Sequence, residues 1–94
     1  MPNPVHRTLT ADTELVLTLD QNFGEIRITV VANPAVVYFN TSDTAIGTVV
    51  GNMDGNEVLP AVLCSRVARD QTAGAVSKVR VRSAGTPTIS VGGL

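Results

Sequence analysis

The sequence has little that would support catalysis or metal binding. Its 94 residues contain one histidine, His6, and one cysteine, Cys64. One cysteine cannot form an intramolecular disulfide, so a disulfide-rich secreted scaffold is not expected. A zinc site needs about four Cys, His or carboxylate ligands, and a catalytic triad needs a base that is oriented by an acid. We therefore expect no enzyme, no catalytic residue, no metal and no cofactor, with His6 exposed and Cys64 a buried, inert thiol.

Aromatic side chains and net charge are also scarce. The aromatics are Phe23, Tyr38 and Phe39, there is no tryptophan, and the formal net charge is −1. Sugar-binding sites usually present aromatic platforms, and readers of single-stranded nucleic acid stack bases on aromatic rings. A near-neutral chain also lacks the cations that neutralise phosphates or bind an anionic membrane surface. We expect no nucleic-acid partner and no membrane partner.

We expect no signal peptide and no membrane-spanning segment. The stretch MPNPVHRTLT has no apolar region of the signal-peptide kind, and no run approaches the roughly 18–20 apolar residues that span a bilayer. Asn40 begins a glycosylation triplet, but without a leader it is expected to end a strand. The length predicts one domain, 1–94, which buries roughly 60–65% of its unfolded surface. Oligomerisation would therefore add useful stability.

The feature that is present throughout is a period of two. In TELVLTLD, Leu15, Leu17 and Leu19 alternate with Glu14 and polar or smaller residues, which is typical of a strand with one face on a core and one in water. Gly, Pro and Asn residues separate the runs. We predict the strands Val5–Thr10, Thr13–Leu19, Glu25–Val31, Ala35–Asn40, Val62–Ala68, Val76–Ser83 and Pro87–Val91. The fold class is all-β, a compact antiparallel β-sandwich or small barrel of about seven short strands.

Two segments leave alternatives open. Val62, Arg66 and Arg69 have helical spacing, but Pro60 suits the entry to a strand, so a strand is preferred. The segment Thr41–Glu57 resembles a loop and could contain one short strand in TAIGTVV. Its GNMDGNE stretch carries oxygen donors that could hold calcium, although Asp-Gly is also a common hairpin turn, and the turn is preferred.

One strand carries a stripe of cations. Lys78, Arg80 and Arg82 alternate with Val79 and Val81, so they share a face and span about 13 Å at roughly 3.3 Å per residue. One interpretation is a solvated sheet face on which acids such as Glu14, Glu25 and Asp20 pair with these cations. The other is contact with an acidic partner protein, for which arginine is well suited. The candidate partner-contact residues are Lys78, Arg80, Arg82, Arg66 and Arg69.

Two longer stretches carry a resemblance. They are the C-terminal stretch VSKVRVRSAGTPTISV and the N-terminal stretch LTADTELVLTLDQNFGEIRITVVANPAVVYFNT. Both resemble small β-rich virion proteins of tailed bacteriophages of actinobacteria. The segment Glu57–Ala73 matches no pattern of that group. The resemblance implies a non-enzymatic virion structural protein, either a capsid decoration (cement) or a head-fibre-like protein. Such a protein is made in the host cytoplasm and lies on the capsid surface, where it bridges major capsid protein subunits, often as a trimer.

The same resemblance leaves two points open. The segment 1–7, with Pro2 and Pro4, could lie on a neighbour as an extended arm or could be a frayed terminus. The alternative function is a tail-tip or fibre domain that binds a host surface receptor, with the loop Thr41–Glu57 carrying recognition.

Overall fold

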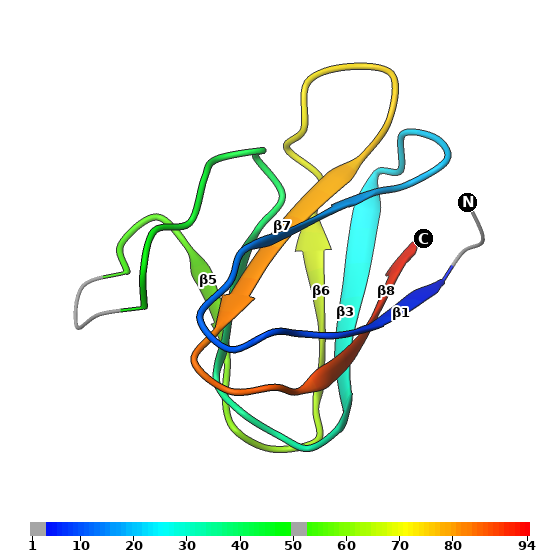
Figure 1. Cartoon of the computed structure of the whole chain (residues 1–94). Coiled ribbons are helices and arrows are strands. Elements are labelled where there is room, and N and C mark those ends of the chain that lie inside the picture. The colour runs from blue at the N-terminus through cyan, green and yellow to red at the C-terminus, as the bar shows by residue number, and fades with distance from the viewer. Residues whose placement is uncertain (1–3, 50–52) are drawn as a thin grey trace.

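The chain folds into two antiparallel sheets that face each other (Figure 1). The computed structural model describes residues 4–49 and 53–94. Sheet A has the strand order β1-β8-β3-β6 and sheet B the order β2-β7-β4-β5. The strands are β1 (Val5–Thr8), β2 (Leu15–Thr18), β3 (Glu25–Ala32), β4 (Val37–Asn40), β5 (Glu57–Leu59), β6 (Ser65–Arg69), β7 (Lys78–Ser83) and β8 (Thr88–Gly93). The predicted all-β sandwich is confirmed.

The core lies between the inner faces of the two sheets, and the alternation in the sequence explains it. Ile28 of β3 pairs with Val91 of β8, and both are fully buried. From sheet B, Phe39 and Val81 are Cα partners and are equally buried. Their sequence neighbours point outward, because successive side chains of a strand alternate between faces. Each sheet therefore contributes one apolar face to the core and keeps one outer face.

The seven strand predictions are confirmed with changed bounds, and one strand was missed. Strands β3, β6 and β8 continue past their predicted ends, to Ala32, Arg69 and Gly93, and every predicted strand except β3 begins later or ends earlier than predicted. Residues 65–69 form strand β6 and not a helix, so the preferred alternative is confirmed. The missed strand, β5, lies at the end of the segment that we expected to be a loop. It has three residues and one buried side chain, Leu59, too few to show a period. No strand occurs over residues 44–49, and Val50 of TAIGTVV lies outside the described residues.

Large apolar side chains are exposed at one end of the sandwich. The β3–β4 and β5–β6 connections meet at the lower end of Figure 1, where the Val30 amide donates to the Cys64 carbonyl at 2.8 Å. Four exposed residues belong to this end: Val31, Val36, Val62 and Leu63. We call these four residues the apolar end.

The predicted N-terminal arm is only partly described. Residues 1–3 lie outside the described residues, whereas Val5 to Arg7 belong to β1, which pairs with β8. The described chain contains no helix of the length and apolarity needed to cross a membrane.

Candidate functional site

The cation stripe Lys78, Arg80 and Arg82 lies on the outer face of sheet B, as the alternation predicts. The intervening Val79 and Val81 are fully buried. The stripe is not an open surface, however. The side chains of Lys78, Arg80 and Arg82 are 39%, 22% and 16% exposed, so burial increases along the strand. Another part of the chain must therefore cover the stripe on the outer face of sheet B.

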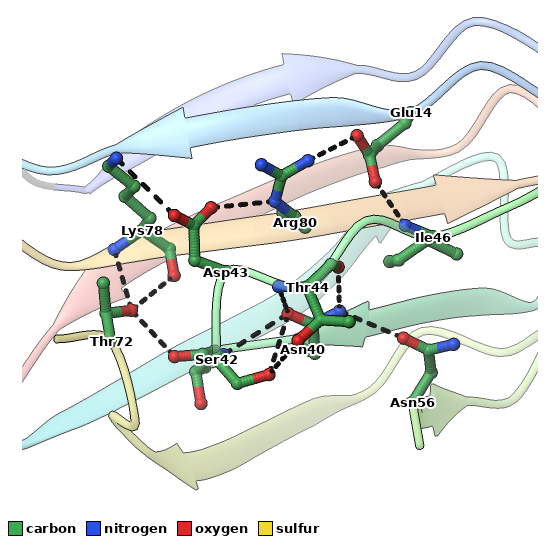
Figure 2. A network of polar contacts seen from close by, with 11 residues as sticks. Glu14, Asn40, Ser42, Asp43, Thr44, Ile46, Asn56, Thr72, Lys78 and Arg80 are labelled. Carbon is green, nitrogen blue, oxygen red and sulfur yellow. Dashed lines mark hydrogen bonds and ion pairs between the residues drawn. The ribbon is translucent and has the colours of Figure 1, made fainter. Parts of the chain in front are cut away.

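Carboxylates from two distant segments neutralise the first half of the stripe. Arg80 pairs with Glu14 at 2.7 Å and with Asp43 at 2.8 Å. Asp43 also lies 3.6 Å from the Lys78 ammonium. Figure 2 shows the Asp43 carboxylate between the two cations. A cation held between two acids has little charge left to offer a partner.

Asp12 and the backbone of the covering segment hold the second half. The Arg82 Nε donates to Asp12 Oδ1 at 2.9 Å, and its other nitrogens donate to the Asp12 and Ile46 carbonyls at 2.6 and 3.0 Å. The Ile46 amide in turn donates to Glu14, and the Val49 amide donates to Asp12. We call Thr41–Val49 the covering segment, because these bonds hold it over the stripe.

The covering segment also buries apolar surface. Ile46 is 2% exposed, yet it does not belong to the main core between the sheets. Its contacts with Glu14 and Arg82 place it on the outer face of sheet B. The segment therefore combines ion pairs with a small apolar contact.

Hydrogen bonds and ion pairs shift the titration of Asp12 and Asp43 toward the charged form. The pKa of Asp12 is lowered, first by the hydrogen bond from the Val49 amide and then by Arg82. The pKa of Asp43 is lowered mainly by its hydrogen bond with Arg80, which raises the pKa of Arg80 in return. Both aspartates thus remain ionised at neutral pH and stay paired with the stripe.

Asn40, the last residue of β4, fixes both ends of the long connection. Its amide group donates to the Thr44 carbonyl at 2.7 Å and to the Asn56 side chain at 3.0 Å. Its oxygen accepts from the amides of Ser42 and Thr44. Figure 2 shows this side chain at the centre of the network. Asn40 is buried, and the prediction that it ends a strand is confirmed.

The two remaining candidate cations have different surroundings. Arg66 of β6 pairs with Glu57 of β5 at 2.9 Å and donates to the Val58 carbonyl. It therefore links the adjacent edges of the two sheets. Arg69 is exposed, and its side chain has no ion pair in the part of the chain that is described. The prediction that these five cations contact a partner stays a prediction, but Arg69 is the one with a free charge.

Sequence reasoning identified one of the three acids that neutralise the stripe. Glu14 was expected there, but Glu25 lies in sheet A and Asp20 follows the end of β2. The missed acids, Asp12 and Asp43, both have positive φ, at 48° and 58°. Aspartate adopts this conformation more readily than most residues and favours turns. Asp12 lies in a turn and Asp43 directly follows a bend, and each carboxylate reaches a cation of the sheet.

A polar hollow of about 470 Å³ adjoins the Asn40 network. Its wall includes Thr41, Asn56 and Glu57 on one side and Arg69 and Gln71 on the other. The polar residues that line it carry amides, hydroxyls, one carboxylate and one guanidinium. Such a hollow can form hydrogen bonds with a polar ligand, but among the described residues that line it no nucleophile is hydrogen-bonded to a base.

The other candidate residues remain apart. His6 is on edge strand β1, and Cys64 is half-buried beside the core, with its sulfur 4.0 Å from the Pro60 carbonyl. Over residues 4–49 and 53–94, no group of three His, Cys, Asp or Glu side chains could hold a metal ion. Asp54 and Gly55 form a turn, as preferred, and Gly55 has a φ of 86°.

Comparison with protein families, with curated proteins and with solved structures finds no match to this chain. The functional argument therefore depends on the sequence and the geometry.

Proposed function

We propose that the chain is a non-enzymatic structural subunit of a tailed-phage virion, of the capsid-decoration kind. It binds the outside of the head and bridges major capsid protein subunits, and the favoured oligomer is a trimer. The observation that supports this proposal best is the apolar end. Four large apolar side chains are exposed at the end where two connections meet, one of them near the end of β3 and three on the connections, and apolar side chains gathered at one end of a small domain mark a protein contact.

The energetics suit a lattice partner. Burial of one Val or Leu side chain contributes about 1.5–3 kcal/mol before ordering costs, so one apolar end gives a weak contact. Many copies on a repeating shell, or three copies in a trimer, would multiply this contact through effective concentration. The two-sheet core gives each copy a rigid base for the connections that form the contact.

The test is co-sedimentation with heads that were assembled without this protein. We expect the wild-type chain to saturate the heads, and Val62→Asp with Leu63→Asp to lower the affinity roughly tenfold or more. Val16→Asp is the matched control, because Val16 is 40% exposed but lies on β2, away from the apolar end. Wild-type occupancy by the double variant, or no binding by the wild type, would contradict the proposal.

A second function is favoured by the polar hollow. A tail-tip or fibre domain would bind a host surface receptor there, through residues of the long connection and of β6. In that case labelled protein would bind host cells and would be absent from heads. Arg69→Ala with Gln71→Ala would abolish cell binding, while Val62→Asp with Leu63→Asp would not.

A further inference from the structure

The cations that form no ion pair within the described residues lie in sheet A. Of the seven Lys and Arg residues, four form ion pairs: Arg66, Lys78, Arg80 and Arg82. The other three form none within the described ranges: Arg7, Arg27 and Arg69. They lie on β1, β3 and β6, respectively. The cations that are able to meet an external acid are therefore not those of the stripe.

Arg27 borders a hollow on the outer face of sheet A. Its Cα partner on β8 is Gly92, and the next outward pair is Thr29 with Ser90. Because Gly92 has no side chain, the face is indented there, and the hollow of about 200 Å³ extends to Pro4. At about 30 Å³ per water, this volume holds roughly six or seven waters, which is room for one side chain.

The hollow offers hydrogen-bond donors to an anion. Arg27 is exposed and brings a guanidinium with five N–H groups. Ser90 makes no hydrogen bond through its hydroxyl within the described part of the chain. Thr29 shares a hydrogen bond of 3.0 Å with Ser65. A carboxylate that enters here can therefore accept from the guanidinium and from at least one hydroxyl.

The second free guanidinium lies on the same face. Val67 of β6 is opposite Arg27, and Arg69 is two residues further along β6. Diagonal neighbours on adjacent strands are about 7–8 Å apart, close to the roughly 6.6 Å between alternate side chains of an extended segment. Val67, 42% exposed, lies between the two arginines and can pack against methylene groups.

We propose that the outer face of β8, β3 and β6 binds an extended acidic segment of a partner protein. One glutamate enters the hollow and pairs with Arg27, and a second, two residues along, pairs with Arg69. The glutamate stems pack on Val67, which favours Glu over the shorter Asp. Guanidinium and carboxylate match as a planar, bidentate pair.

Charge on this face selects the kind of partner. Glu25 lies on the same strand and face as Arg27, and its Cα partner is Arg69, although these two charges form no ion pair within the described residues. A continuous polyanion such as nucleic acid would meet this carboxylate, whereas two separate glutamates can avoid it. The site is distinct from the apolar end, and the inference holds whether or not the chain is a virion protein.

The experiment titrates the full chain with a capped peptide, Glu-Thr-Glu-Thr-Glu, at low salt and follows backbone amide shifts by NMR. We expect shifts at Arg27, Val67, Ser90 and Gly92. Arg27→Gln with Arg69→Gln should lower the affinity roughly tenfold or more. Gly92→Val keeps every charge and fills the hollow, and it should weaken binding as well, because φ at Gly92 is not positive and valine suits a strand.

The controls separate this site from general charge attraction. Arg7→Gln removes one free cation of the same sheet away from the face and should bind as the wild type does. The glutamine peptide Gln-Thr-Gln-Thr-Gln should not bind. Since neither Arg27 nor Arg69 has an ion-pair partner among the described residues, the variants should keep wild-type spectra.

Three results would overturn the inference. They are shifts centred on the stripe Lys78–Arg82, unchanged binding by the double variant, and equal shifts of the face with oligothymidylate. If peptide binding fails while the wild type still co-sediments with heads, the inference fails and the proposed function stands.

Discussion

The outer faces of both sheets carry cations, which are paired with carboxylates on sheet B and unpaired, among the described residues, on sheet A. On sheet B, the stripe is paired with three carboxylates and lies under the covering segment. On sheet A, Arg27 and Arg69 are exposed, and neither has an ion pair within the described residues. The difference arises from the connections: sheet B has a long one that folds back over its face. A row of cations on a strand can therefore bind an acidic partner only where no carboxylate of the same chain already pairs with it.

The largest difference in stability between the two faces should appear when a hydrogen-bonding side chain is removed from each. Asn40→Ala deletes the buried amide that holds both ends of the long connection, and the Thr44 backbone groups and the Asn56 side chain lose this partner. We expect a loss of about 1–3 kcal/mol in the free energy of unfolding, measured by urea denaturation.

Ser90→Ala on sheet A is the matched control for this substitution. Surface substitutions of this kind usually change stability by about 0.5 kcal/mol or less. Equal losses for the two variants would mean that the long connection is not anchored through Asn40.

Low pH should weaken the ion pairs that hold the covering segment on sheet B. The lowered pKa values of Asp12 and Asp43 mean that their ion pairs contribute full stability above the unfolded value of about 3.9. This contribution is lost as the pH falls through the lower, folded-state values. Asp43→Asn should therefore be less stable than the wild type at pH 7, and the difference should shrink at low pH.

Glu25→Gln provides the comparison on sheet A, because Glu25 has no ion pair within the described ranges. It should lower the urea midpoint at pH 7 less than Asp43→Asn does. If the Asp43→Asn difference is constant with pH, Asp43 does not act through its charge.

The two-sheet architecture was predictable because it depends on alternation, a local signal. The same signal correctly predicted that Val79 and Val81 are buried and that the stripe faces outward. It could not show what covers the stripe. The acids of the Arg82–Asp12 and Arg80–Asp43 pairs lie 70 and 37 residues away, and the covering segment has no period. The sequence could not identify the unpaired arginines either, since Arg27 differs from Arg80 only in what the fold places beside it.

The most direct test of this account is hydrogen exchange at the arginine Nε–H groups, followed by NMR at neutral pH. The Nε–H groups of Arg80 and Arg82 donate to Asp43 and Asp12, so they should exchange slowly. Those of Arg27 and Arg69 have no such acceptor within the described residues and should exchange several-fold faster. Fast exchange at Arg80 and Arg82, equal to that at Arg27, would show that the stripe is open and would contradict the account.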